Sequence, residues 1–231
     1  MRKSGILLAI SSIPSKYGIG SFSKEAYEFV DFLEKAGQSL WQILPLGPTG
    51  YGDSPYQSFS TFAGNPYYID LEEFITKGYL TKEECDNSDL GDGEFVDYEK
   101  IFHAKFKLLK KAFLKSNLEE NRDYQEFIEK NEGWLDDYAL FMALKDSFGG
   151  ISWIEWDNDI KLRKKSVLAK YRKELAQEIA FYKFQQYYFA KQWKELKGYA
   201  NDKGIEIVGD IPIYVALDSA DTWANPQLFQ V

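Results

Sequence analysis

The sequence predicts an α/β fold whose sheet is at least partly parallel. Three short apolar runs are spaced along the chain, at residues 5–10, 40–44 and 205–213. Continuous apolar runs of this length are typical of strands buried on both faces, as in parallel sheets. A helical pattern fills the gap between the first two runs, and a strand, a helix and a strand in succession form a βαβ unit with parallel strands.

The first helix is expected to start after Ser21 or Ser23, either of which can cap it, and to end near Gly37. Residues 45–66, after the second apolar run, are rich in Gly, Pro, Ser and Tyr and have no helical period. A loop this long at the carboxyl end of a strand is often functional. Residues 67–71 are compatible with a short strand.

The next part of the chain, residues 98–200, carries a mostly helical pattern. Breaks in this pattern are expected at Asn117, around residues 131–133 and at residues 149–150. The last helix is expected to be long, over residues 166–199, with aromatic residues on one face that pack against the rest of the protein.

The composition describes a folded, acidic protein of 231 residues. It has 36 Asp and Glu against 28 Lys and Arg, a net charge of −8, and 45% hydrophobic residues. This apolar content excludes a wholly disordered chain. Nucleic acid is disfavoured as a partner, because a phosphate backbone requires a basic patch and the basic residues here alternate with acids.

Cys85 and His103 are the only cysteine and histidine in the sequence. A single cysteine forms no intrachain disulfide and no cysteine-based zinc site, and a single histidine rules out a multi-histidine metal site. We expect His103 to be structural or solvated, because no acid lies at ligand spacing from it. The apolar run at residues 5–10 is too short for a signal peptide, and no run reaches the roughly 18 residues of a membrane span. We therefore expect a cytoplasmic protein without membrane association.

Residues 18–23 nearly match the dinucleotide-binding fingerprint GxGxxG, with Ser23 in place of the third glycine. Residues 11–17 separate this segment from the preceding strand, whereas the fingerprint requires a tight turn. A nucleotide site is one interpretation. The sequence favours the other, in which Gly18 and Gly20 shape a loop before a helix.

Two places in the chain suggest a binding site. Residues 47–58 combine Gly and Pro with Tyr, Asp, Ser and Gln, and such a loop can present an aromatic face together with hydroxyl and amide groups, which suits a sugar. Asp210 lies in the third apolar run, where burial of an unpaired carboxylate would be costly. Both places are expected at the carboxyl edge of the sheet, where α/β proteins bind their ligands.

At these residues the sequence resembles the amylomaltase or 4-alpha-glucanotransferase family. The motifs follow the family's order over the whole chain, with Asp157 as a departure, since Pro is expected there after the second Trp. The segments that carry the resemblance are IPSKYGIG (13–20), WQILPLGPT (41–49), GDSPYQS (52–58), GNP (64–66), FGGISW (148–153) with Trp156, GDIPIYV (209–215) and DSAD (218–221).

The resemblance implies a (β/α)₈ barrel, of which this chain would be an incomplete N-terminal part with about three barrel strands and a large helical insertion. It also implies a retaining transfer of an α-1,4-glucan segment to the 4-hydroxyl of an acceptor glucose or glucan. In such a double displacement an aspartate forms a covalent glycosyl-enzyme and a glutamate acts as acid and base, with the carboxyl groups about 5 to 5.5 Å apart. No cofactor is implied, and the expected partners are maltooligosaccharides and α-1,4-glucans.

Under this resemblance, Ser54 and Tyr56 would line the subsite of the attacked sugar, with Tyr56 stacking on its ring, and Asp210 would hydrogen-bond the same sugar. The family's nucleophile and acid/base segments do not occur in the sequence. We therefore expect no catalytic residue in this chain and no activity from the chain alone. A naturally short glucan-binding protein without catalysis remains an alternative, as does, less favoured, a hydrolase of the wider α-amylase group.

The resemblance also predicts how the chain is divided. A closed barrel needs eight strands and typically about 250 residues, so we expect the N-terminal portion of a longer enzyme. The expected parts are residues 1–75 with the first barrel units and the substrate loop, residues 76–165 with a mainly helical insertion, and residues 166–231 with the long helix and the third barrel strand.

Overall fold

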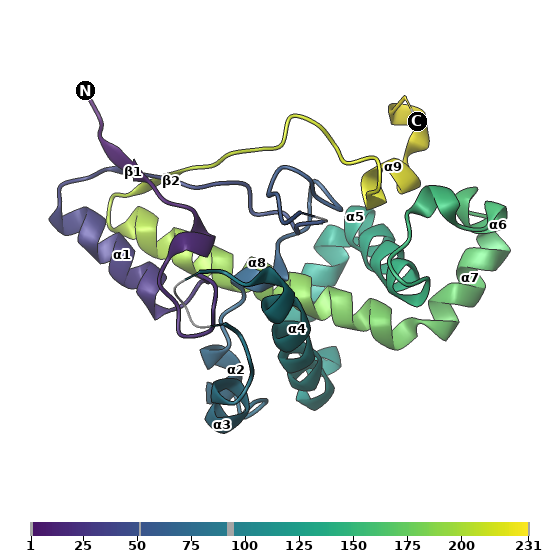
Figure 1. Ribbon diagram of the computed structural model, residues 1–231, viewed down its shortest axis with the longest axis horizontal. Coiled ribbons are helices and arrows are strands. Elements are labelled where there is room, and N and C mark those ends of the chain that lie inside the picture. The colour runs from purple at the N-terminus through teal and green to yellow at the C-terminus, as the bar shows by residue number, and fades with distance from the viewer. Residues whose placement is uncertain (1, 51, 92–94, 231) are drawn as a thin grey trace. The chain divides into compact units, whose positions relative to one another are not determined.

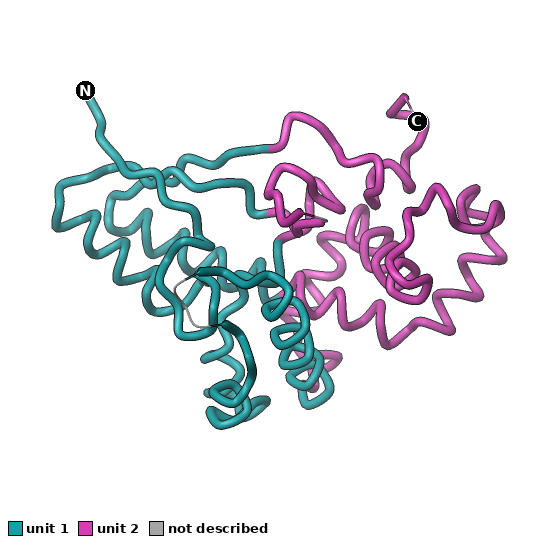
Figure 2. Tube along the Cα trace, in the orientation of Figure 1, with its two compact units in different colours: residues 1–46, 65–116, 188–211 teal, residues 47–64, 117–187, 212–231 magenta. Residues whose placement is uncertain are grey.

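The structure is a computed structural model that describes residues 2–50, 52–91 and 95–230 (Figure 1). The chain forms two compact units, and each is described by itself (Figure 2). Unit 1 comprises residues 1–46, 65–116 and 188–211, and unit 2 comprises residues 47–64, 117–187 and 212–231. The three-part division expected from the sequence stays a prediction.

Unit 1 contains a parallel three-stranded sheet, as the apolar runs predicted. Its strands are β1 (Gly5–Leu7), β2 (Leu40–Gln42) and β3 (Glu206–Val208), in the spatial order β1-β2-β3. Ile6 pairs with Trp41, and Trp41 pairs with Ile207. An α/β fold with a parallel sheet is therefore confirmed.

The two faces of this sheet differ in burial, which corrects the expectation of strands buried on both faces. Trp41 is fully buried and packs edge-on against Phe29 of α1 (Lys24–Lys35). On the opposite face, Leu7 of β1 is 57% exposed and Val208 of β3 is 39% exposed. An apolar run shows that a strand has apolar side chains on both sides, but it does not show whether both sides are covered.

The helices of unit 1 follow the sequence signals at their ends. Ser23 is the N-cap of α1, and Gly37 follows the helix with a left-handed φ of 66°, as a helix C-terminus prefers. The expected short strand at residues 67–71 is wrong, because residues 66–68 form a 3-10 turn that is capped by the Asn65 side chain and starts with a proline. The other helices of this unit are α2 (Glu72–Thr76), α3 (Lys82–Asp86), α4 (Tyr98–Lys115) and the last part of α8 (Ala176–Asp202).

The loop between β1 and α1 depends on two glycines. Gly18 has a φ of 77°, and a Cβ atom there would lie 1.7 Å from the carbonyl oxygen of Leu90. A Cβ atom on Gly20 would lie 1.9 Å from the carbonyl oxygen of Ile10. Both positions therefore need glycine for close backbone packing, in agreement with the loop-shaping interpretation.

Unit 2 is helical and has an aromatic core. Phe141, Trp156 and Trp223 form a group of rings whose centroids are 5.4 to 5.9 Å apart. The helices that supply this core and its surroundings are α5 (Arg122–Ser147), α6 (Asn158–Lys161), α7 (Lys165–Glu174), the first part of α8, and α9 (Ala220–Ala224).

Two of the expected helix boundaries are wrong. Helix α5 continues through residues 131–133, because Leu135 and the residues after it bury one face of the helix and outweigh the cost of Gly133. The helix expected over residues 166–199 is divided at Leu175 into α7 and α8. The breaks at Asn117 and at residues 149–150 are confirmed. Within the described residues, no helix combines the length and the apolar character that crossing a membrane requires.

Candidate glucan-binding site

The loop of residues 47–64 belongs to unit 2 and is folded back on itself. Thr49 and Ser58 form an antiparallel bridge, and the Gly50 amide donates to the Gln57 carbonyl at 3.2 Å. At the tip, the Gln57 amide donates to the Ser54 carbonyl at 3.1 Å. The segment that carries the sugar-binding motif is therefore a hydrogen-bonded turn on a short two-stranded stem.

Ser54 and Tyr56 lie together in this turn. The Tyr56 amide donates to Ser54 Oγ at 3.3 Å, and the Tyr56 side chain is 45% exposed. Gly52 and Asp53 precede them with left-handed φ values of 83° and 52°, a conformation that an aspartate adopts at some cost. Burial raises the pKa of the Asp53 carboxyl. The turn can thus present an aromatic face beside a hydroxyl group, which is the combination that a sugar ring requires.

The base of the loop is joined to other parts of unit 2. Ser58 Oγ donates to the Ser60 carbonyl at 2.7 Å and accepts from the Ser60 amide at 3.2 Å. Thr61 donates to the carboxylate of Asp221, with its amide at 2.8 Å and its hydroxyl at 3.2 Å. These contacts connect the turn to the N-terminal end of α9.

Asp210 lies in unit 1, two residues after β3, and is half-buried. The strand expected over residues 205–213 is shorter, because β3 ends at Val208 and Ile211 and Ile213 after it are exposed, so Asp210 lies beyond the strand and not within it. The structure brings Ser54 and Tyr56 together in unit 2 and describes Asp210 in the other unit, so the three are not placed relative to one another.

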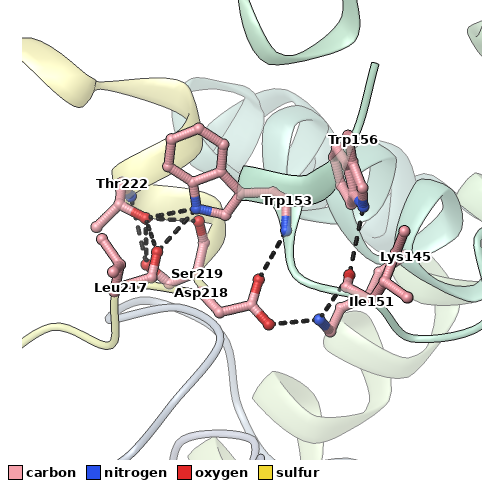
Figure 3. Close-up of polar contacts among 8 residues, drawn as sticks. All are labelled: Lys145, Ile151, Trp153, Trp156, Leu217, Asp218, Ser219 and Thr222. Carbon is pink, nitrogen blue, oxygen red and sulfur yellow. Dashed lines mark hydrogen bonds and ion pairs between the residues drawn. The ribbon is translucent and has the colours of Figure 1, made fainter. Parts of the chain in front are cut away.

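Sequence reasoning missed a network in unit 2 around an ion pair between the buried Lys145 and the partly exposed Asp218 (Figure 3). Lys145 of α5 contacts Asp218 at 2.5 Å, and Asp218 also accepts from the Trp153 amide at 3.1 Å. The Trp153 indole donates to the Leu217 carbonyl at 2.8 Å and to Thr222 Oγ1 at 3.2 Å. The DSAD motif carries Asp218, but no signal in the sequence pairs it with a lysine 73 residues away.

A hollow of about 520 Å³ lies in unit 1. Burial raises the pKa of Asp70, one of its lining residues, to about 6. Glu73, another lining residue, accepts hydrogen bonds from Lys191 and Gln192, both at 2.9 Å. These hydrogen bonds hold the Glu73 carboxylate of α2 against α8. Among the residues that the structure describes, no group of three or more His, Cys, Asp or Glu could hold a metal ion.

Comparison with known proteins decides the family. The family model described as 4-alpha-glucanotransferase matches residues 8–231. The chain belongs to this family. A 4-alpha-glucanotransferase of Clostridium butyricum is 56% identical over 95% of this chain and 45% of the relative's length, and one of Streptococcus pneumoniae is 50% identical over 99% and 46%. The chain thus spans about half the length of the curated relatives that it matches.

Two solved structures of amylomaltases are similar to this chain. An amylomaltase from Streptococcus agalactiae, solved in complex with acarbose, superposes with a TM-score of 0.95 at 46% identity and covers 100% of this chain and 47% of that one. An amylomaltase from Corynebacterium glutamicum is 20% identical, with a TM-score of 0.72, over 97% of this chain and 32% of that one. The second likeness supports the fold alone.

Asp157, at which this 4-alpha-glucanotransferase family member departs from the expected motif, has a local role. Asp157 is the N-cap of α6, and its side chain accepts from the Asp159 amide at 3.0 Å. A proline would have no carboxylate with which to cap this helix. The replacement therefore fits the backbone that follows Trp156.

Proposed function

We propose that this chain forms the glucan-binding part of a 4-alpha-glucanotransferase. The whole protein would transfer a segment of an α-1,4-glucan to the 4-hydroxyl of an acceptor glucose or glucan, by a retaining double displacement without a cofactor. The observation that carries the proposal is the hydrogen-bonded turn that holds the half-exposed Tyr56 beside Ser54 within a motif of the family. The proposed location is the cytoplasm, in keeping with the free thiol of Cys85.

Three side chains receive roles in this proposal. The Tyr56 ring stacks on the attacked sugar, Ser54 contributes a hydroxyl to the same subsite, and Asp210 accepts a hydrogen bond from that sugar. The segments that resemble the family's nucleophile and acid/base do not occur in these 231 residues. The chain by itself is therefore expected to bind glucan without transferring it.

The three-stranded sheet supports a finer proposal about the fold, a (β/α)₈ barrel. In a barrel each parallel strand lies beside the next strand in the chain, and the order β1-β2-β3 follows this rule. The doubly wound order 3-2-1-4-5-6 also keeps its first three strands side by side, so it is the family match that favours the barrel over that sheet. The exposed Leu7 and Val208 would then face barrel side chains that this sheet does not supply.

Titration with maltoheptaose tests the binding function. Calorimetry of the 231-residue chain should give saturable binding, and Tyr56→Ala should weaken it at least about tenfold, because stacking on an aromatic ring contributes about 1.4 kcal/mol or more. Phe62→Ala is the matched control, since Phe62 is an exposed aromatic of the same loop that has no role in the proposed subsite.

Three results would contradict the proposal. Absence of binding by the wild-type chain would remove the binding function, and equal losses from Tyr56→Ala and Phe62→Ala would remove the role of Tyr56. Disproportionation of maltotriose by the chain alone would show that the reacting carboxylates had been wrongly judged absent.

A further inference from the structure

The last part of the 47–64 loop is held by α9 through three hydrogen bonds. The Ala220 amide donates to the Phe59 carbonyl at 2.8 Å. The two carboxylate oxygens of Asp221 accept separately from Thr61, one from its amide at 2.8 Å and the other from its hydroxyl at 3.2 Å. One carboxylate thus fixes both the backbone and the side chain of a residue that is 160 positions away.

The end of α9 that provides these contacts is itself well fixed. Figure 3 shows Asp218, just before α9, between the amine of Lys145 and the amide of Trp153. Ser219 accepts from the Thr222 amide and so caps the helix, and Thr222 Oγ1 donates to the Leu217 carbonyl at 2.6 Å. Asp221 therefore projects from a segment with little freedom to move.

Hydrogen bonds and short pieces of backbone together lead from this contact to the proposed subsite. Thr61 follows Ser60, whose amide and carbonyl both bond to Ser58 Oγ. Ser58 pairs with Thr49, and the neighbouring Gln57 bonds to Gly50 and to Ser54 in the turn. A shift of the loop base is consequently passed to the turn that carries Tyr56.

A purely local role of Asp221 would explain less. An acid in the first turn of a helix interacts favourably with the helix dipole, but that interaction needs no partner in the 47–64 loop. The use of both carboxylate oxygens on Thr61 is the feature that the local role leaves unexplained.

We propose that Asp221 is a positioning residue, which sets the orientation of the turn that bears Ser54 and Tyr56 without touching the glucan. The proposal rests on the glucan-binding function proposed above. It assigns to the DSAD motif the task of holding the sugar-binding loop in the conformation that accepts an α-1,4-glucan. Preorganisation of this kind improves affinity, because a loop that is already ordered loses no conformational entropy when the glucan binds.

The first test is the affinity for maltoheptaose of the 231-residue chain and its variants. Asp221→Ala should weaken binding about tenfold, because the loop loses a charge-assisted contact to two donors. Asp221→Asn keeps an oxygen for the Thr61 amide and should stay within about threefold of wild type. Thr61→Val, which removes only the hydroxyl contact, should have a similarly small effect.

Asp137→Ala is the matched control for general loss of stability. Asp137 is another partly buried carboxylate of unit 2, paired with Arg163 at 2.6 Å and outside the loop. Its removal should lower the free energy of unfolding yet leave the dissociation constant for maltoheptaose within about twofold. An equal loss of affinity in Asp137→Ala and Asp221→Ala would overturn the positioning role.

The second test needs no sugar and therefore separates this inference from the binding function. Hydrogen exchange of the Gly50 and Gln57 amides, which form the stem and the turn, should accelerate at least about fivefold in Asp221→Ala and remain near wild type in Asp221→Asn and Asp137→Ala. Unchanged exchange in Asp221→Ala overturns the inference, whether or not the chain binds glucan. Absence of binding by wild type together with accelerated exchange would instead contradict only the proposed function.

Discussion

Each unit of the protein contains a buried lysine, and the two amines are satisfied in different ways. Lys105 of unit 1 is 1% exposed, and its amine donates to the Tyr67 carbonyl at 2.5 Å. Lys145 of unit 2 is 7% exposed, and its amine contacts both the Ile151 carbonyl at 3.2 Å and the Asp218 carboxylate at 2.5 Å. In unit 1 a backbone carbonyl dipole stabilises the charge of Lys105. In unit 2 the charge of Lys145 is compensated by a carboxylate.

This difference separates a packing role from a connecting role. Burial lowers the pKa of Lys105 to about 8, against the opposing influence of Asp70 and Cys85, so its positive charge is held in unit 1 at a cost. The charge of Lys145 instead joins α5 to the segment that leads into α9. A buried lysine therefore indicates a stabilising ion pair only where a carboxylate is within reach.

The largest effect is expected from Lys145→Met. Removal of the amine leaves Asp218 without its ion pair, and because Asp218 is about one-third exposed the loss should be about 2 kcal/mol, below that of a fully buried pair. Urea unfolding measures it. The same variant should also weaken maltoheptaose binding, since α9 loses part of its support.

The double variant Lys145→Met, Asp218→Asn provides the control for this effect. Without a charge left unpaired, it should recover part of the lost stability. A double variant less stable than Lys145→Met alone would show that the ion pair is not the reason for the loss.

The pH dependence of stability gives the next largest effect and concerns Lys105. Its pKa is about 8 in the folded protein against 10.5 for an ordinary lysine. Between these values the unfolded chain binds a proton that the folded protein has lost, so stability rises with pH, by at most about 1.4 kcal/mol per unit. This stabilisation is lost as the pH falls through 8.

The measurement compares wild type with Lys105→Met in urea titrations at pH 7, 8, 9 and 10. Cys85, whose pKa burial raises to about 11, contributes with the opposite sign and interacts with Lys105, so both proteins should also carry Cys85→Ala. A difference that does not change between pH 8 and 10 would mean that Lys105 keeps an ordinary pKa in the folded protein.

The smallest effect is expected from Lys105→Met at pH 7. The variant loses one hydrogen bond to Tyr67 but removes the cost of burying a charge, and the two changes should nearly cancel, within about 1 kcal/mol. A loss as large as that of Lys145→Met would show that the two buried lysines have equivalent roles, contrary to the comparison.

Local signals in the sequence predicted much of the fold. The serine before α1 and the glycine after it marked that helix, and the three apolar runs marked the strands. The errors arose where tertiary contacts decide. Leu135 and its neighbours carry α5 through Gly133, and no local pattern distinguishes Leu175 from the helical residues on either side of it.

The candidate site shows the same limit more sharply. The residue types of the 52–58 motif were sufficient to nominate Ser54 and Tyr56, because aromatic and hydroxyl side chains at a loop indicate a sugar. The support of that loop could not be predicted, since the contact of Asp221 with Thr61 joins residues that are 160 positions apart. The DSAD motif was noted in the sequence only as part of the family resemblance, and nothing in it shows which residue Asp221 contacts.

The 160 positions between Thr61 and Asp221 also determine the order in which contacts of the loop form during synthesis. The turn at Ser54 and Gln57 closes between residues three positions apart and can form as soon as it is made. Its support must wait for α9, which at about 5–20 residues per second emerges roughly 10–30 s after Thr61. During that interval the tip of the loop has its local shape, while the contact of Thr61 with Asp221 has not yet formed.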